Sequence, residues 1–472
     1  MIRLVVILIV CLSSSNLISS NISVDNIRLV NRDGVAQSPF SIIFDISWDN
    51  AWHNEKNHDA AWVFMKYSGY WNNHVKVAAT GHRVLKNRTE SNNPTIQVSE
   101  DGVGLYILPP EDFRGHTSYK VQIVIDTTGA VPSWSKIKDV KVHAIEMVYI
   151  PQGGFEVGSP DADAIKRAAF YSSNNEGGYK GSFTIKSEDE IQVGPEEDKF
   201  YYWSESALYN GDQKGPIPSD FPKGYDAFYI MKYELTQGQY AAFLNDIPVN
   251  WTYLRSPLGG RDYYKKRGGI RLEKGIYKAD APTRPMNYVS FTDGLAYSDW
   301  AGLRPITELE YEKAARGPAP PKDAEFVWGT SNYNNLERYV NTQAELVFTH
   351  DIDEGDLNDD NRDVFGASYY WVMDLSGSVW EKVITVGNEI GRQFKGSHGD
   401  GNLDFGNATN EDWPTSDNEK GGFGYRGGGY YEVGTTYSDF NPHSPIGYRY
   451  YGAWSGGPRY ISYGYRAGRS AD

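Results

Sequence analysis

Residues 302–317 have the sequence GLRPITELEYEKAARG, which contains the clearest helix signal in the chain. The Thr307 side chain can accept a hydrogen bond from the backbone of Glu310, and the Glu310 side chain can accept one from the backbone of Thr307. This reciprocal pair is the capping box of a helix start. Gly317 follows Arg316 as glycine does where a helix ends. The stretch therefore predicts a short, doubly capped helix.

Few other helix signals surround this stretch. Thr236 and Gln239 form a second capping box, and a third helix is expected over residues 292–300. Residues 159–225 are rich in Gly, Asp, Glu and Ser, so we expect a loop-rich surface insertion with little regular structure. Short apolar segments and polar loops fill the rest of residues 144–472, which predicts an α+β domain.

Residues 21–143 show a different pattern, in which apolar and polar side chains alternate with a period of two. On one face of residues 40–49 lie Ile42, Phe44, Ile46 and Trp48. Residues 119–126 alternate in the same way. Such segments, separated by turn-forming residues, predict an antiparallel β-sandwich. We place the boundary with the second domain between residues 143 and 144.

Residues 1–20 have the layout of a signal peptide. Arg3 precedes a short apolar run, and small residues lead to Ser20. Cleavage near Ser20 also removes Cys11, the only cysteine of the chain. Lipid attachment at Cys11 is the alternative, but Val10 stands where such sites have a small residue. We expect an exported protein in the periplasm, at the cell surface or in the medium.

The composition excludes several classes of partner. The net charge is −15 and no stretch is rich in Lys and Arg, so a nucleic-acid partner is not expected. No second long apolar segment follows the signal peptide, so we expect no transmembrane segment. The 49 Gly and 35 Tyr residues instead predict tight turns between short aromatic strands.

Five further motifs lie in a fixed order with the helix stretch. They are EMVYIPQGGF at 146–155, FYIMKYELT at 228–236, MDLSGSVWE at 373–381, RGGGY at 426–430 and GYR at 464–466. With these motifs, residues 144–472 resemble the formylglycine-generating enzyme, or sulfatase-modifying factor, family. The resemblance implies the irregular C-type-lectin-like α+β fold of these enzymes.

The same resemblance separates the fold from the activity. Enzymes of this family oxidise a substrate cysteine with two cysteines that hold copper, and soft thiolates select Cu(I). The family positions of these cysteines correspond to Gly447, just before Tyr448, and to Gly452. No catalytic residue and no copper site are therefore expected. A related branch uses a three-histidine iron site, but His350, His398 and His443 are widely separated in the sequence.

The tail that follows Gly447 is rich in aromatic side chains. The cleft position implied by the family makes Arg449, Tyr450 and Trp454 candidates for binding a partner, because aromatic and Arg side chains dominate binding hot spots. The alternative is that most of the aromatic residues of this tail form the core of a strand-poor fold.

The family also binds calcium structurally, and hard oxygen ligands are present at two places. One site corresponds to Asp374 and Glu381 with the carbonyls of Gly377 and Val379. A second corresponds to Asn341, the carbonyl of Thr342, and either Asp353 or Asp356. A solvated acidic loop over residues 351–363 is the alternative for the second site.

Three functions are compatible with these observations. The favoured one is an exported, non-catalytic protein that binds or scaffolds a protein or glycan partner at the degenerate substrate cleft. Similar cysteine-free family members look like parts of bacterial surface and secretion machinery. The alternatives are an oxidoreductase with a rebuilt metal site and a lectin-like carbohydrate binder.

Overall fold

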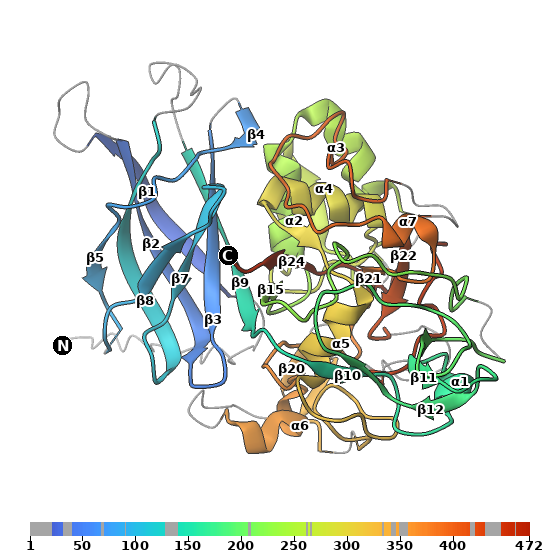
Figure 1. Ribbon diagram of the computed structural model, residues 1–472. Helices are drawn as coiled ribbons and strands as arrows, with labels where there is room; N and C mark the ends of the chain where they lie inside the picture. The colour runs from blue at the N-terminus through green and yellow to red at the C-terminus, as the bar shows by residue number, and fades with distance from the viewer. Residues whose placement is uncertain are drawn as a thin grey trace, which may run out of the picture.

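The computed structural model describes residues 21–31, 40–67, 70–89, 91–127, 140–205, 209–260, 263–264, 267–332, 335–340, 346–348, 357–415, 421–429, 445–457 and 459–472. The chain is mostly β with few helices (Figure 1). Antiparallel sheets form the N-terminal part, and a loop-rich part with short helices follows. This is the order of architecture that the sequence predicts.

Two sheets face each other in the N-terminal part. The first has the order β1-β2-β8-β5, formed by β1 (Ser23–Asn31), β2 (Phe40–His53), β8 (Phe113–Val124) and β5 (Arg83–Asn87). The facing strands are β3 (Asp59–Tyr67), β7 (Gly104–Leu108) and β6 (Thr95–Val98), with β4 (Tyr70–His74) paired to β3. Alternate side chains of both sheets enclose one apolar core, which includes the predicted face of β2.

The second of these sheets continues into the C-terminal part. Beyond β3 it runs through β9 (Val140–Ile150), β15 (Phe228–Met231), β24 (Ala467–Ser470) and β18 (Arg304–Pro305). Strand β9 pairs with β3 on one side and with β15 on the other. It passes through residues 143 and 144, the predicted boundary, without a break. The two parts are therefore joined by one eight-stranded sheet.

The longer helices begin where the sequence predicts. Helices α2 (Gln237–Asp246) and α5 (Glu308–Arg316) both have complete capping boxes, and Gly317 ends α5 with a φ of 65°. Helix α4 covers Phe291–Ala301. Figure 1 shows α2, α3 (Val249–Arg255) and α4 grouped beside the shared sheet. The short helices are α1 (Ala164–Arg167), α6 (Arg362–Phe365) and α7 (Glu389–Arg392), with 3-10 turns at Pro257–Gly259 and Asp359–Asn361.

The insertion over residues 159–225 is more regular than predicted. Strands β12 (Tyr179–Gly181), β11 (Tyr171–Ser173) and β14 (Phe200–Tyr201) form a small sheet, and β10 (Phe155–Val157) pairs with β13 (Phe183–Ile185). Phe170, Phe200 and Tyr202 of this segment are fully buried. These aromatic side chains give the segment buried apolar contacts, which its high content of Gly, Asp, Glu and Ser does not predict.

Three smaller sheets complete the C-terminal part. Strand β16 (Ile270–Glu273) pairs with β17 (Ile276–Ala279), and β19 (Arg338–Val340) pairs with β20 (Leu346–Phe348). The third sheet has the order β22-β21-β23, formed by Phe423–Arg426, Trp380–Ile384 and Tyr463–Gly464. This last sheet carries the candidate site.

Candidate functional site

Gly447 and Gly452, where the resemblance predicts the family cysteines, are both tightly packed. A Cβ atom at Gly447 would lie 2.8 Å from the carbonyl oxygen of Gly158. A Cβ atom at Gly452 would lie 2.8 Å from an Nη atom of Arg449 and 2.9 Å from its Cζ. Real Cβ atoms do not approach other groups this closely, so a side chain at either position requires its neighbours to move.

The guanidinium next to Gly452 belongs to a buried ion pair. Arg449 is fully buried and donates two hydrogen bonds to Glu308, at 2.7 and 2.9 Å. It also donates to the carbonyls of Ala168 and Asn210, and it lies 4.1 Å from the ring centroid of Phe170. Arg449 therefore faces the protein interior, and the structure does not present it to a ligand.

This ion pair is part of a larger network on α5, all nine residues of which are buried. Glu312 accepts hydrogen bonds from Arg426 and Arg316. Arg316 also donates to Glu325, while Arg304 and Glu310 form a separate bidentate pair. Each glutamate of the helix thus faces an arginine, as buried charges require. The network fixes α5 beneath the site.

An aromatic pocket of about 270 Å³ opens on the other side of Gly452. Its walls are Tyr209, Trp380, Tyr425, Tyr451, Trp454 and Tyr463. Three of them share one face of the β22-β21-β23 sheet, because Trp380 pairs with Tyr463 and Lys382 pairs with Tyr425. The turn at Gly452 adds the rings of Tyr451 and Trp454, whose centroids are 5.6 Å apart.

A buried lysine lies against this pocket. The Lys382 ammonium is 5.1 Å from the ring centroid of Tyr425 and 4.7 Å from that of Tyr463, and it donates to the carbonyl of Val289. The negative faces of these two rings are therefore already engaged by a cation. The predicted candidate Trp454 lines the pocket, whereas the Tyr450 ring packs on Tyr448 with a centroid distance of 5.8 Å and is not among the lining residues.

The first predicted calcium position contains a third carboxylate that the sequence reasoning missed. Asp374 and Glu381 lie near Glu234, and all three side chains are buried. Arg466 donates to Glu381 at 2.8 Å, while Val379 N–H donates to Glu234 at 3.0 Å. Burial and the neighbouring carboxylates raise the pKa of Glu234 well above its ordinary value, and burial raises the pKa of Glu381. One arginine thus faces three acids.

These residues fit a hard cation in their chemistry. Glu234 Oε2 and Glu381 Oε2 are buried and have no hydrogen-bond partner among the described residues. Asp374 and Gly377 have φ angles of 63° and 92°, so the backbone is left-handed at both residues. This conformation decides how the carbonyls of the turn are oriented, and carbonyl oxygens are ligands that Ca²⁺ accepts. Among the described residues, no group of three His, Cys, Asp or Glu side chains has the geometry of a metal site. Backbone carbonyls would have to complete the coordination.

The second predicted calcium position is not tested. Asn341, Thr342, Asp353 and Asp356 lie outside the described residues, as do His350 and His443. His398 is described, and its Nε2 accepts a hydrogen bond from Ser470 N–H. Burial lowers the pKa of His398 to about 2, with Arg469 adding to the effect. It therefore acts as a neutral structural acceptor.

Comparison with known proteins agrees with this geometry. Residues 197–428 match the family model of the sulfatase-modifying factor enzyme 1-like domain. The chain contains a domain of the formylglycine-generating enzyme type. This formylglycine-generating-enzyme-like domain includes α5, the turn at residues 373–381 and three of the six residues that line the aromatic pocket. The family model ends before Gly447, so the packing of the two glycines comes from the structure alone.

Curated relatives match the same domain. A formylglycine-generating enzyme of Bos taurus is 32% identical over 183 residues, which cover 33% of this chain and 48% of that protein. One from Thermomonospora curvata is 33% identical over 103 residues, or 22% of this chain and 33% of the relative. A hercynine oxygenase of Mycobacterium tuberculosis is 30% identical over 166 residues, covering 33% and 37%. The chain spans less than half the length of each of these relatives.

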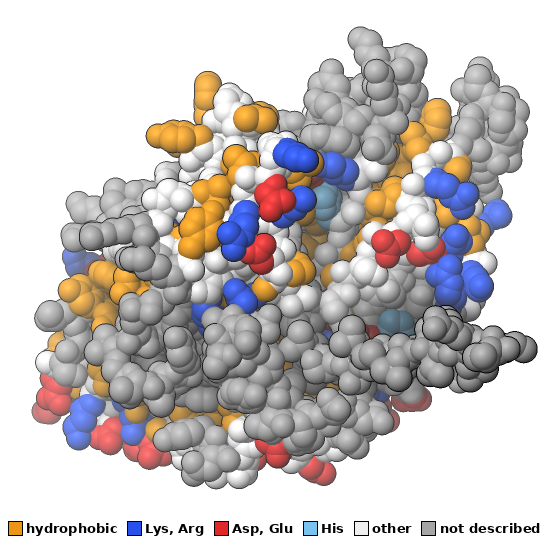
Figure 2. Space-filling view, turned by 180° about the vertical axis from the view of Figure 1, so that it is seen from behind, with side chains coloured by type: hydrophobic (Ala, Val, Ile, Leu, Met, Phe, Trp, Pro, Cys, Tyr) orange, Lys and Arg blue, Asp and Glu red, His pale blue; other side chains and the backbone are white. Residues whose placement is uncertain are grey.

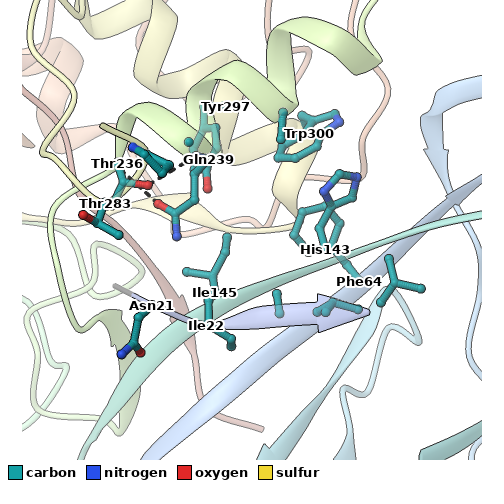
Figure 3. A pocket seen from close by; sticks show the side chains of 16 residues that line it. Asn21, Ile22, Phe64, His143, Ile145, Thr236, Gln239, Thr283, Tyr297 and Trp300 are labelled. Atoms are coloured by element: carbon teal, nitrogen blue, oxygen red, sulfur yellow. Dashed lines mark hydrogen bonds between the residues drawn. The ribbon is translucent and has the colours of Figure 1, made fainter. Parts of the chain in front are cut away.

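A separate pocket of about 470 Å³ lies where the sandwich meets the formylglycine-generating-enzyme-like domain. Figure 3 shows Ile22 and Ile145 of the sandwich side opposite Gln239 and Tyr297 of the helices. Both polar and apolar residues line this pocket. One of them, His143, donates a hydrogen bond from Nε2 to the Asp246 carboxylate at 2.8 Å. This pocket could not be predicted from the sequence, because its walls come from segments far apart in the chain.

The surface charge agrees with the composition. On the face shown in Figure 2, Lys and Arg side chains lie next to Asp and Glu side chains. No helix in the described part of the chain is both long and apolar enough to cross a membrane.

Proposed function

We propose that this chain is an exported, non-catalytic binding protein whose formylglycine-generating-enzyme-like domain recognises a macromolecular partner through the aromatic pocket. The packing at Gly452 carries the proposal. The Arg449 guanidinium, held by Glu308, stands within 2.8 Å of where a Cβ would be, so this position supports a structural ion pair in place of a metal-binding thiolate. The adjoining pocket keeps Trp454 and Tyr209 partly exposed.

The experiment compares chemistry with binding in the same preparation. The chain without its leader is incubated with copper and a cysteine-containing sulfatase peptide, and we expect no conversion of the cysteine to formylglycine. Conversion would overturn the proposal. In parallel, the immobilised chain is used to capture partners from the native cell envelope and medium. We expect a partner that Trp454→Ala loses and Trp251→Ala, a change on helix α3, retains.

A calcium ion is the cofactor that we propose for the fold. Asp374 and Glu381, with the carbonyls of Gly377 and Val379, would hold it. Its charge would balance the buried carboxylates, including that of Glu234, which Arg466 alone does not. The ion would supply structural support to the turn that carries Trp380 to the pocket. Copper is not part of the proposal.

A carbohydrate is the second candidate for the ligand, and the aromatic pocket favours it. Six rings around about 270 Å³ can stack on the apolar face of a sugar. Because Lys382 already faces two of the rings, a neutral ring suits the pocket better than a cation does. A glycan array with and without calcium tests this idea. Binding that Trp454→Ala abolishes would support it, and an array without signal would remove it.

A further inference from the structure

Three buried charged side chains meet where β9 of the shared sheet pairs with β15. Lys232 follows β15, and its Nζ lies 2.9 Å from a carboxylate oxygen of Asp59 and 3.2 Å from one of Glu146. All three side chains have at most 1% of their surface exposed. Lys232 also donates to the carbonyl of Asn50 at 2.7 Å. Two carboxylates therefore share one ammonium.

Backbone and indole N–H groups complete this cluster: Trp52 N–H and Trp48 Nε1–H donate to Asp59, and Asn21 is the donor to Glu146. Asn21 N–H donates to Glu146 Oε1 at 3.2 Å. The Asn21 side chain is fixed as well, because its amide donates to the Asp49 carboxylate and its Oδ1 accepts from Asp49 N–H at 3.1 Å. Figure 3 shows Asn21 beside Ile22 at the rim of the pocket between the two parts. A neutral amide at this place leaves the cluster one positive charge short.

We propose that the leader is removed between Ser20 and Asn21, and that the freed α-ammonium of Asn21 is the second cation of the cluster, paired with Glu146. Hydrolysis adds water across the peptide bond. Ser20 leaves with the new carboxylate, and the Asn21 nitrogen becomes an amine that takes up a proton. The peptidase is the leader peptidase of the exporting cell. Ser20 has the small side chain that such enzymes require before the cut.

The charge count and the hydrogen-bond geometry both support this assignment. With the α-ammonium, Asp59 and Glu146 face two cations, and the buried cluster becomes neutral. Without it, burial raises the pKa of Glu146 to about 7 despite the neighbouring Lys232. Charge-assisted hydrogen bonds are about twice as strong as neutral ones. Removal of the leader would thus complete the joint between the sandwich and the second domain, independently of what the aromatic pocket binds.

The first experiment determines the N-terminus. The full chain is produced in an exporting host, and the intact mass of the exported product is measured. We expect the mass of a chain that begins at Asn21. A product that keeps the leader or begins at another residue would overturn the proposal.

The second experiment measures the ion pair. Chains beginning at Asn21 are compared with chains that carry Gly-Ser before Asn21, both in the natural sequence and with Glu146→Gln. We expect the extension to raise the unfolded-to-folded ratio in urea about tenfold in the natural sequence and at most about twofold in Glu146→Gln. Glu111→Gln, an exposed change, should behave like the natural sequence. Equal effects of the extension in all backgrounds would overturn the pairing.

A chemical measurement covers the case in which Glu146→Gln does not fold. The α-amine of the natural chain beginning at Asn21 is acylated with a small active ester, in buffer and in denaturing urea. A paired ammonium should react at least about tenfold more slowly in the folded chain. Equal rates would contradict the assignment.

Discussion

At the residue scale, the crowded space next to Gly452 is the feature on which the proposed loss of copper chemistry depends. The position has no side chain, and the Arg449 guanidinium occupies the volume in which a thiolate would stand. Arg449 in turn needs that volume to reach Glu308. A side chain at position 452 and the Arg449–Glu308 ion pair therefore compete for the same space.

The crowding at Gly452 leads to a stability prediction. Gly452→Ala should lower the free energy of unfolding by about 1–3 kcal/mol, because the new methyl group displaces the buried guanidinium. Urea denaturation measures the change. Gly181→Ala is the matched control, since nothing lies within 4 Å of its Cβ position. Equal stability of the two variants would contradict the packing described here.

Lys66 gives a prediction for pH dependence. Burial lowers its pKa to about 7, although Asp246 and Asp299 act in the opposite direction, and its Nζ lies 3.2 Å from His74 Nε2. Between pH 7 and about 10.4 the unfolded chain binds a proton that the folded chain lacks, so stability should rise with pH there. We expect the wild type to gain on the order of several kcal/mol relative to Lys66→Met across this range.

The control for this titration is Lys86→Met, which changes an exposed lysine and should leave the pH profile parallel to that of the wild type. Unfolding in urea at a series of pH values provides the measurement. A wild-type profile parallel to that of Lys66→Met would show that Lys66 keeps an ordinary pKa.

At the element scale, helix α5 shows how far sequence reasoning reaches. Its start, end and capping box follow from Thr307, Glu310 and Gly317, because these are contacts between residues a few positions apart. The pairing of Glu308 with Arg449 does not follow, since the partners are separated by 141 positions. Local hydrogen bonds are encoded locally, whereas buried ion pairs depend on the complete topology.

Breaking this pairing should be costly. Glu308→Gln leaves the Arg449 guanidinium buried without its counter-ion, so we expect a loss of about 3–5 kcal/mol in the free energy of unfolding. Denaturation by urea tests the expectation. Lys180, paired at the surface with Glu197 and Asp198, offers a control, because Lys180→Met should leave the free energy of unfolding nearly unchanged.

The sequence predicts a calcium position at the turn over residues 373–381. It does not predict that a third carboxylate, that of Glu234, lies beside this turn. Glu234 belongs to the motif at residues 228–236, but its distance from Asp374 in the sequence hid their proximity in space.

Calcium binding at this turn gives a stability prediction. Adding Ca²⁺ should raise the free energy of unfolding by about 2.7 kcal/mol at a hundredfold excess over Kd. The gain should vanish in Glu381→Gln and persist in Asp360→Asn, which alters an exposed acid. Calorimetric scans with Ca²⁺ and with EDTA provide the comparison.

At the scale of the whole molecule, one eight-stranded sheet contains strands from both of the parts that the sequence pattern separates. After β9, long strands give way to short strands, loops and short helices. Pattern reasoning cannot see that β9 serves both parts, because strand pairing joins residues that are distant in the chain. The sequence likewise predicts only part of the aromatic pocket, namely Trp454 and its neighbours in the tail.

Producing the C-terminal part alone tests whether its strands depend on the N-terminal part. Residues 144–472 produced alone lack β3, so the edge of β9 that pairs with it would be exposed. We expect this piece to aggregate or to show much weaker protection of amides in β9 and β15 than the full chain shows. Hydrogen exchange measured by mass spectrometry is the readout. A soluble piece with the protection of the full chain would show that the two parts are independent.

The position of β24 has a consequence for the order in which the molecule is assembled. This strand lies between β15 and β18, yet it is made long after them. While residues 467–470 are still missing, β15 has an open edge, and the sheet cannot close. The sheet shared by the two parts is therefore completed late in synthesis, and until then the free edge of β15 is open to pairing with other chains.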